Sequence, residues 1–194
     1  MRKILGKITH TLLLPFLASV KGQEHIPPEP FIAVANHASF IDGILLYSIL
    51  AKRNIAIHFV IVEWMYNNRI MRWFLNWMQQ IKCGNAVQKC LHQLEQGKSI
   101  GIFAEGKRSR DGTPVPIVHS GAGVVALLTG APLLPVTISG THRWWGFGKM
   151  IPTFRKQITI VIHKPLRYPK KKNVQRGPAR NIVREVMKQI YQKI

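Results

Sequence analysis

A histidine and an aspartate with four residues between them, His37 and Asp42, stand in the stretch VANHASFIDG (34–43). A carboxylate that accepts a hydrogen bond from one imidazole nitrogen fixes the tautomer of the ring and leaves the other nitrogen as a general base. Such a base can take the proton from a substrate hydroxyl, which then attacks an activated acyl group without any serine nucleophile. Because five positions along a regular helix do not bring two side chains to one face, a bend in the chain must bring this pair together.

The same stretch also allows a purely structural interpretation. Ser39 is followed three positions later by Asp42, which is the spacing of a capping box. In that arrangement the carboxylate of Asp42 satisfies backbone N–H groups at the start of a helix and needs no catalytic role. The spacing alone leaves both interpretations open.

Basic residues gather in a second stretch, GIFAEGKRSRDG (101–112). It places three cations beside a carboxylate and a glycine, namely Glu105, Gly106, Lys107, Arg108 and Arg110. Guanidinium forks suit phosphate oxygens, and glycine lets the backbone approach them closely, so the stretch is typical of an anion site. A solvated basic turn is the alternative, because RDGT is ordinary turn chemistry.

This second stretch also comes close to a nucleotide-binding P-loop, since Gly101 is followed after four residues by Gly106 and Lys107. However, Arg108 stands where a P-loop needs Ser or Thr to bind magnesium, and the intervening IFAE is typical of a strand rather than a loop. We therefore discount nucleotide binding at this position.

The elements that must position these residues follow from hydrophobic patterning. Apolar and β-branched runs predict strands at 31–35, 55–62, 99–103, 133–138 and 157–162. Segments suited to helices lie at 42–52, 64–80, 86–96, 120–130 and 181–194. This alternation predicts an α/β fold, a single domain with a central β-sheet flanked by helices. Sites in such folds gather beyond the carboxyl ends of strands, which is where both stretches lie.

Composition limits the class of protein. The 194 residues include 28 Lys and Arg against 8 Asp and Glu, a formal charge of +20, and 46% are hydrophobic. Such a chain folds around a real core, and its charge attracts nucleic acid, anionic lipid or acidic substrates. Cys83 and Cys90 are too few for a disulfide framework and lack the paired spacing of a zinc site, so we expect reduced thiols and no metal.

Two segments suggest contact with a membrane surface. We expect residues 1–20 to form an interfacial helix, because Ile4, Leu5, Ile8 and Leu12 recur at helical spacing beside Arg2, Lys3 and Lys7. Three of the five tryptophans, Trp64, Trp73 and Trp77, crowd a second segment that also carries Arg69 and Arg72. A third stretch, 142–150, adds Trp144, Trp145 and Phe147 as a further contact or as the lining of an acyl tunnel. No stretch has the roughly 18 uninterrupted apolar residues of a spanning helix.

Together the motifs resemble those of the glycerolipid acyltransferase family, which includes the 1-acyl-sn-glycerol-3-phosphate acyltransferases. The first block of the family, Asn-His-four residues-Asp, is matched by Asn36, His37 and Asp42. Its phosphate block, usually Pro-Glu-Gly-Thr-Arg-Ser, is matched by Glu105, Gly106, Arg108 and Ser109, with Ala104 and Lys107 as departures. A later proline-bearing block is matched by residues 132–136.

The resemblance implies transfer of a fatty acyl group from acyl-CoA or acyl carrier protein to a lysolipid hydroxyl, with 1-acyl-glycerol-3-phosphate the expected acceptor and phosphatidate the product. His37, oriented by Asp42, would act as the base. The implied substrate-binding residues are Asn36, Glu105, Gly106, Lys107, Arg108, Ser109 and Lys82. No metal or bound cofactor is implied. Residues 21–194 would form the acyltransferase domain, peripheral or monotopic on the cytoplasmic face of an anionic membrane.

One departure from the family leaves the acceptor open. The family usually carries an arginine between its two main blocks that contacts the acceptor phosphate, whereas this chain has IKCGNAVQ (81–88), with Lys82 as the candidate substitute. Another lysolipid or a non-phosphate acceptor is therefore an alternative, as is a basic membrane- or nucleic-acid-binding protein without catalysis. Nucleic acid is the less expected partner, because no known nucleic-acid-binding module is present.

Overall fold

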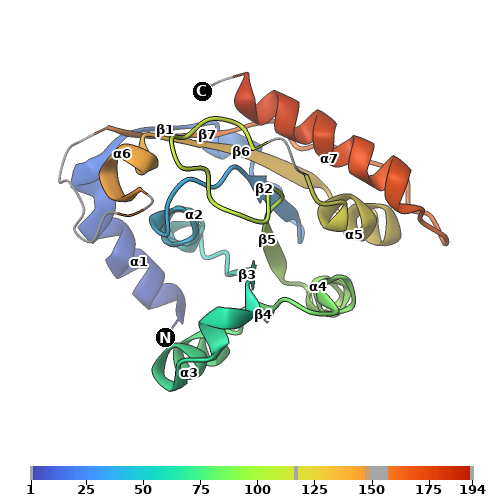
Figure 1. Cartoon of the computed structure of the whole chain (residues 1–194), viewed down its shortest axis with the longest axis horizontal. Helices are drawn as coiled ribbons and strands as arrows, with labels where there is room; N and C mark the ends of the chain where they lie inside the picture. The colour runs from blue at the N-terminus through green and yellow to red at the C-terminus, as the bar shows by residue number, and fades with distance from the viewer. Residues whose placement is uncertain (1, 116–117, 147, 149–156, 193–194) are drawn as a thin grey trace.

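The computed structural model of the chain describes residues 2–115, 118–146, 148 and 157–192 (Figure 1). Its strands are β1 (Leu17–Lys21), β2 (Ile32–Ala35), β3 (Ile57–Ile61), β4 (Ile81–Lys82), β5 (Ser99–Phe103), β6 (Leu133–Ser139) and β7 (Ile158–Ile162). They form a seven-stranded sheet in the order β1-β7-β6-β2-β5-β3-β4. Neighbouring strands pair in parallel except β6 and β7, which are antiparallel. The predicted α/β fold with a central sheet is confirmed.

The helices connect these strands. They are α1 (Arg2–Leu13), α2 (Ile41–Lys52), α3 (Arg69–Trp77), α4 (Ala86–Glu95), α5 (Gly121–Thr129), α6 (Thr141–Trp145) and α7 (Arg176–Tyr191). Short 3-10 segments lie at η1 (Leu14–Phe16), η2 (Gln23–His25) and η3 (Glu63–Tyr66). Within the described ranges, none of these helices combines the length and the apolar character that crossing a membrane requires.

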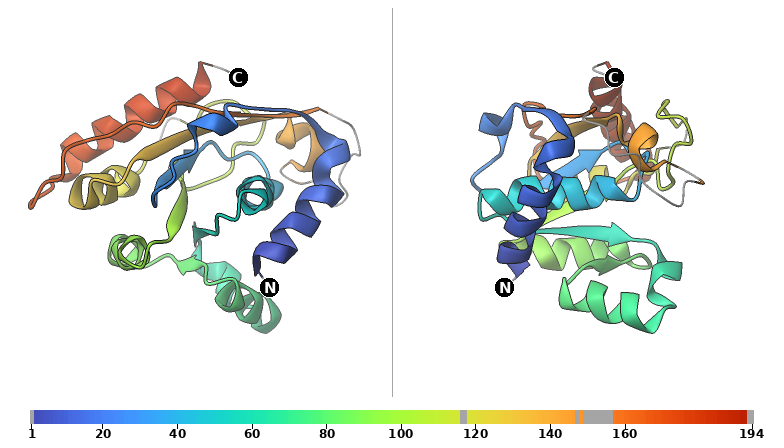
Figure 2. Two further views of the ribbon diagram at one scale, coloured as in Figure 1. Left: turned by 180° about the vertical axis from the view of Figure 1, so that it is seen from behind. Right: turned by 90° about the vertical axis from the view of Figure 1, so that its left-hand side faces the viewer.

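Helices cover both faces of the sheet (Figures 1 and 2). α1, α2 and α6 pack on one face around a cluster that contains Phe31, Ala33 and Ala35. α4, α5 and α7 pack on the other face around a cluster that contains Ile32 and Val34. Successive residues of a strand point to opposite faces, so β2 contributes to both clusters in alternation. This double burial explains why the FIAVA stretch is continuously apolar, and it places the end of β2 in the middle of the sheet.

The N-terminal prediction needs a correction. The helix expected over residues 1–20 ends at Leu13, and residues 17–21 form the edge strand β1, paired with β7. Pro15 cannot continue the helix because its ring removes a backbone N–H. The predicted boundary at residue 20 therefore falls inside a strand of the main sheet, and α1 packs against α2.

Two other predicted helices have different bounds. The segment 64–80 divides into η3 and α3, because the Asn68 side chain accepts the N–H groups of Ile70 (2.9 Å) and Met71 (3.0 Å) and so begins a new helix. The helix predicted over 181–194 begins earlier, at Arg176, and residues 193–194 lie outside the described part of the chain. Pro178 fits there because the first turn of a helix has N–H groups without intrahelical partners.

Candidate active site

The two sequence motifs meet at one edge of the sheet. β2 pairs with β5 so that Ala35 lies opposite Phe103, the last residue of each strand. Because the strands are parallel, the chain leaves both at the same edge, and residues 36–42 lie beside the loop that begins at Ala104. The bend after β2 then leads into the first turn of α2, where Asp42 lies.

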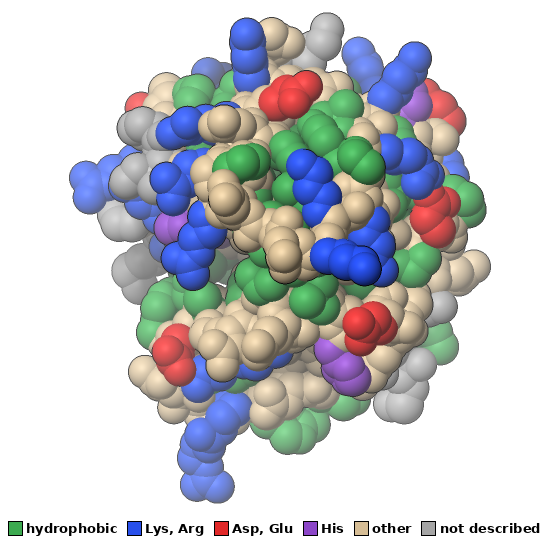
Figure 3. Space-filling model, turned by 90° about the vertical axis from the view of Figure 1, so that its right-hand side faces the viewer, with side chains coloured by type: hydrophobic (Ala, Val, Ile, Leu, Met, Phe, Trp, Pro, Cys, Tyr) green, Lys and Arg blue, Asp and Glu red, His purple; other side chains and the backbone are tan. Residues whose placement is uncertain are grey.

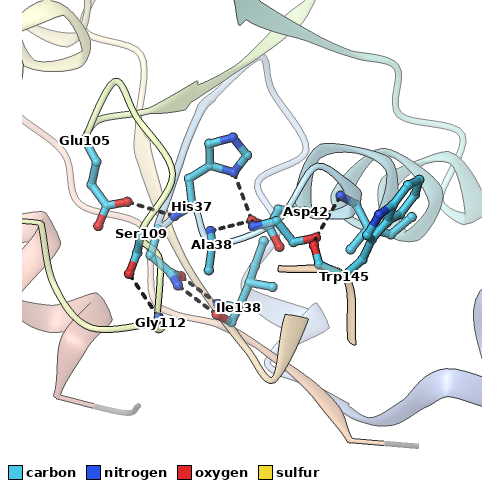
Figure 4. A network of polar contacts seen from close by, with 11 residues as sticks. His37, Ala38, Asp42, Glu105, Ser109, Gly112, Ile138 and Trp145 are labelled. Carbon is cyan, nitrogen blue, oxygen red and sulfur yellow. Dashed lines mark hydrogen bonds and ion pairs between the residues drawn. The ribbon is translucent and has the colours of Figure 1, made fainter. Parts of the chain in front are cut away.

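His37 and Asp42 are in hydrogen-bonding contact (Figure 4). Nδ1 of His37 lies 2.9 Å from Oδ2 of Asp42, and the Asp42 side chain is fully buried. The same oxygen accepts the backbone N–H groups of Ala38 and Ser39, both at 2.7 Å. Asp42 therefore binds the backbone at the helix start and also contacts the imidazole, so the two interpretations of the spacing describe one arrangement.

The imidazole of His37 has a defined orientation. Its ring stacks on Phe103 with a centroid separation of 4.1 Å and an interplanar angle of 17°. The Asp42 contact holds Nδ1, and Nε2 points away from that carboxylate (Figure 4). His37 also lines a large cavity, while 19% of its side chain is exposed. One edge of the ring is thus held by protein and the other is available to a bound molecule.

Glu105 holds the backbone of His37. Its Oε2 accepts the His37 backbone N–H at 2.9 Å, and the backbone N–H of Ser109 donates to the carbonyl of His37 at 2.7 Å. Burial raises the pKa of Glu105 to about 7, an effect that the N–H groups of His37 and Val115 oppose and the charge of Asp42 reinforces. Glu105 is buried and is not among the residues that line the cavity, so its observed contact is structural and its place among the substrate-binding residues stays a prediction.

Asn36 makes structural contacts in this structure, and its role in substrate binding stays a prediction. Its amide Nδ2 donates to the carbonyl of Ile138 at 2.7 Å, and the N–H of Ile138 donates to Oδ1 at 2.8 Å. Both polar atoms of the side chain are therefore used by β6, and Asn36 is buried and outside the cavity wall. The residue fastens the end of β2 to β6, which steadies the backbone from which His37 projects.

The loop after β5 places three cations on the cavity wall, Lys107, Arg108 and Arg110. The guanidinium carbon of Arg108 lies 3.6 Å from the ring centroid of Phe40. Partial burial lowers the pKa of Arg108, whereas the charge of Asp42 raises it. Arginine stays protonated under such shifts, so Arg108 presents a positive charge close to the His37–Asp42 pair.

Gly106 and Ser109 shape this loop. Gly106 has φ +66°, and a Cβ there would come within 2.5 Å of the His119 ring, so the position requires glycine. The Ser109 hydroxyl donates to Asp111 at 3.2 Å and accepts the N–H of Gly112 at 3.0 Å. Both residues line the cavity, but the hydroxyl of Ser109 is engaged within the loop.

Lys82 lies apart from this group. Its Nζ is 2.8 Å from Oε1 of Glu63 and 5.9 Å from the ring centroid of Tyr66, at the outer edge of the sheet. Ile81 is buried, and alternation along β4 directs the next side chain outward. Lys82 is not among the residues that line the cavity, so its role as a substitute for the missing arginine stays a prediction.

The cavity itself has a volume of about 2480 Å³. One part of its wall is apolar and comes from α1, α2, η3 and α3, with Leu5, Ile44, Tyr47, Trp64, Ile70, Met71 and Phe74. Another part is polar or basic, with Lys107, Arg108, Arg110, His119, Arg176 and Arg180. Such a division suits an amphipathic molecule that has a long apolar chain and an anionic head. His119, Arg176 and Arg180 belong to neither motif, so no role for them was predictable from the sequence.

The remaining features singled out in the sequence are the aromatic stretch 142–150 and the two cysteines. Trp145 lines the cavity, and its carbonyl accepts the Ser39 hydroxyl at 2.5 Å, whereas Phe147 lies outside the described residues. Cys83 and Cys90 are both free thiols, and burial raises the pKa of Cys90 to about 12. In the described part of the chain, no group of three or more His, Cys, Asp or Glu side chains is arranged to hold a metal ion.

Comparisons with known proteins match a family model and several relatives. A family model described as Acyltransferase matches residues 18–139. The chloroplastic 1-acyl-sn-glycerol-3-phosphate acyltransferase BAT2 of Brassica napus is 28% identical over 195 residues, which covers 90% of this chain and 52% of the relative. The 1-acyl-sn-glycerol-3-phosphate acyltransferase of Borreliella burgdorferi is 31% identical over 153 residues, which covers 74% and 58%. The chain thus spans about half the length of the Brassica relative.

A solved structure shares the fold. The crystal structure of the 1-acyl-sn-glycerophosphate (LPA) acyltransferase PlsC from Thermotoga maritima matches with a TM-score of 0.73 and 27% sequence identity. The match covers 96% of this chain and 77% of that one. The similarity therefore extends over the sheet, both helical layers and the edge that carries His37 and Arg108.

Proposed function

We propose, since the chain belongs to the Acyltransferase family, that it transfers a fatty acyl group from a thioester to the free hydroxyl of 1-acyl-sn-glycerol-3-phosphate, giving phosphatidate. The observation that carries the proposal is the contact of 2.9 Å between Nδ1 of His37 and Oδ2 of Asp42 beside a cavity that Arg108 also lines. The names of the relatives support this choice of acceptor. Acyl-CoA and acyl carrier protein are the two proposed donors.

His37 is the proposed general base. With Nδ1–H donating to Asp42, Nε2 carries a lone pair and takes the proton of the acceptor hydroxyl. The hydroxyl oxygen forms a bond to the thioester carbonyl carbon, giving a tetrahedral intermediate. When that intermediate collapses, the C–S bond breaks, and the leaving thiolate takes the proton back from Nε2. The products are an ester and a free thiol, and the protein returns to its starting state without a covalent acyl-enzyme.

Asp42 supports this step in two ways. Its carboxylate lies against Nδ1 and offsets the positive charge that the imidazole gains when Nε2 is protonated. The N–H groups of Ala38 and Ser39 hold the same oxygen in place, so the imidazole orientation is determined by the backbone of the bend. The base is thereby positioned before any substrate binds, which lowers the cost of reaching the reactive arrangement.

The loop cations suit the acceptor phosphate. In 1-acyl-sn-glycerol-3-phosphate the reacting hydroxyl is on the carbon next to the one that bears the phosphate, so the phosphate must lie close to the base. Arg108 packs on Phe40, near His37 in the chain, and Lys107 stands next to it on the cavity wall. A guanidinium fork and an ammonium group are well suited to a phosphate monoester.

The lipid substrate also requires contact with a membrane, and we propose an anionic membrane surface at the cytoplasmic face. Large apolar side chains of α3 and η3 are exposed, with Ile70 at 78%, Trp73 at 67% and Trp64 at 60%. On α1, Ile4, Ile8 and Leu12 are also exposed. The start of α1 and α3 lie at the same end of the molecule, and the apolar part of the cavity reaches both (Figures 1 and 2). A bilayer at this end could deliver a lipid directly into the cavity.

Acyl transfer from labelled acyl-CoA and acyl carrier protein to a panel of lysolipids tests the proposal. Formation of phosphatidate from 1-acyl-glycerol-3-phosphate, reduced roughly 100-fold or more in His37→Ala, is the expected result. The matched control is His92→Ala, because His92 is exposed on α4 and bonded to Gln96. If product formed only from other lysolipids, the proposed acceptor would be wrong and the proposed reaction would remain. Vesicle binding without any product would replace the proposal by a membrane-binding protein without catalysis.

A further inference from the structure

Two arginines of α7, Arg176 and Arg180, line the cavity far from the motifs in the sequence. They are four positions apart on a helix, so their side chains lie on one face. Ala179, the buried residue next to Arg180, packs against α5, where a Cβ on Gly123 would come within 2.1 Å of the Ala179 carbonyl oxygen. The two helices are thus closely packed, and the cavity wall includes Arg176 and Arg180 of α7 together with Gly121 and Val124 of α5.

The stability of α7 does not explain these arginines. The first turn of α7 contains no acidic residue, and a cation near a helix N-terminus opposes the helix dipole. Within the described residues, neither Arg176 nor Arg180 has a carboxylate partner at ion-pair distance. Figure 3, which views the side where α4, α5 and the start of α7 lie, shows more Lys and Arg than Asp and Glu side chains. Their position on a cavity wall therefore favours an anionic ligand.

Arg176 and Arg180 come from a different part of the fold than Lys107 and Arg108. α7 and α5 cover one face of the sheet, whereas α2, which carries Asp42, covers the other. The cavity joins the two groups, because its wall includes Arg108 as well as Arg176. An acyl transfer between two phosphate-bearing substrates needs two anion sites at different distances from the base. The acceptor phosphate is next to the reacting carbon, but a donor's phosphates are separated from its thioester by the whole pantetheine arm.

We propose that Arg176 and Arg180 bind the phosphate groups at the far end of the acyl donor, the end that acyl-CoA and acyl carrier protein share as a phosphopantetheine. This inference rests on the proposed function and adds a donor site to it. The thioester then lies near His37, the acyl chain lies in the apolar part of the cavity, and the pantetheine arm runs toward the start of α7. Two charge-assisted contacts of this kind raise donor affinity at least tenfold.

Steady-state kinetics of the double variant Arg176→Ala/Arg180→Ala test the proposal. The KM for the phosphate-bearing donor should rise tenfold or more, while kcat and the KM for 1-acyl-glycerol-3-phosphate stay within twofold. The matched control is Arg184→Ala/Lys188→Ala, which removes two exposed cations at the same spacing from the same helix, outside the cavity wall. Arg176→Lys/Arg180→Lys should lose less donor affinity than the double alanine variant, because the ammonium groups keep the charge but not the bidentate fork.

A donor without phosphate distinguishes phosphate binding by the two arginines from a general effect on activity. Acyl-N-acetylcysteamine carries the same thioester, and the double variant should use it as well as the unchanged protein does. Parallel measurements with acyl-CoA and acyl carrier protein identify which donor the site serves, and a tenfold rise for either supports the proposal. A rise in the KM for the acceptor, an equal loss with the phosphate-free donor, or no change with either natural donor would overturn it.

Binding measurements test the donor site without relying on catalysis. Titration calorimetry of free CoA and of holo acyl carrier protein should show at least tenfold weaker binding of one of them to the double variant than to the control. Such a loss would support the site even in a protein that transfers no acyl group to any acceptor, where the proposed function itself would have failed. Equal binding of both ligands by the double variant and the control would contradict the site.

Discussion

The backbone N–H of His37 donates a hydrogen bond to the buried carboxylate of Glu105, 2.9 Å away. Ser109 donates its own N–H to the carbonyl of His37, so the loop after β5 holds both sides of the residue. Hydrogen bonds thus connect the two sequence motifs. One supplies the proposed base, and the other determines where the backbone of that base lies.

The raised pKa of Glu105 predicts a pH-dependent stability. Burial raises this pKa from 4.5 to about 7. Between these values the carboxyl is protonated in the folded chain and ionised in the unfolded chain, so the free energy of unfolding falls as the pH rises through this window. The fall amounts to at most roughly 3 kcal/mol, and Glu105→Gln should remove it because glutamine does not titrate. Urea unfolding at several pH values measures the effect.

The control for this prediction is Glu95→Gln, which changes an exposed glutamate of α4. It should leave the pH profile of unfolding unchanged. A profile of Glu105→Gln that still falls between pH 4.5 and about 7 would show that another group causes the pH dependence.

Asn36→Ala should lower stability without weakening substrate binding. The change removes both partners of the Ile138 backbone groups, and leaving two buried polar groups unsatisfied costs about 1–3 kcal/mol each. The free energy of unfolding, measured with a denaturant, reports that loss, while the KM for the acceptor should stay within twofold. A large rise in KM in a protein of normal stability would restore the predicted contact between Asn36 and the substrate.

Arg108→Ala and Lys82→Ala should have different effects on the KM for the acceptor. Arg108→Ala should raise the KM for 1-acyl-glycerol-3-phosphate about tenfold or more, because a charge-assisted contact to the phosphate is lost. An acceptor without phosphate should be affected much less. Lys82→Ala removes the same charge from the chain, but its side chain pairs with Glu63 away from the cavity, so both acceptors should be used normally. Initial rates at varied acceptor concentration distinguish the two, and matching rises in KM would refute the separation.

Trp73→Glu should weaken membrane binding. Trp73 is 67% exposed on α3, and the substitution removes apolar surface and adds a charge that anionic lipids repel. Partitioning onto vesicles that contain anionic phospholipid should fall about tenfold or more. Gln96→Glu makes the same change in charge at the end of α4 and should leave partitioning almost unchanged. Equal losses in the two variants would indicate a general effect of charge instead.

Much of the fold was predictable because local signals agree with tertiary packing. The FIAVA and SIGIF runs are apolar on both faces because β2 and β5 are central strands, and the turns after them were therefore expected at one sheet edge. β1 and β4 were not predicted. β4 has two residues, and β1 follows directly after a helical pattern, so neither forms without a partner strand.

The family resemblance was readable in the sequence, and the Acyltransferase match confirms it. The two motifs were expected at one edge of the sheet because parallel strands end at a common edge, whereas the contact between His37 and Asp42 was one of two open interpretations. The polar atoms that face the cavity could be identified only from the folded chain. Buried backbone groups must find partners, and His37 and Ile138 find them in Glu105 and Asn36. These partners come from segments that are distant in sequence, so no local sequence pattern predicts which side chains are used in this way.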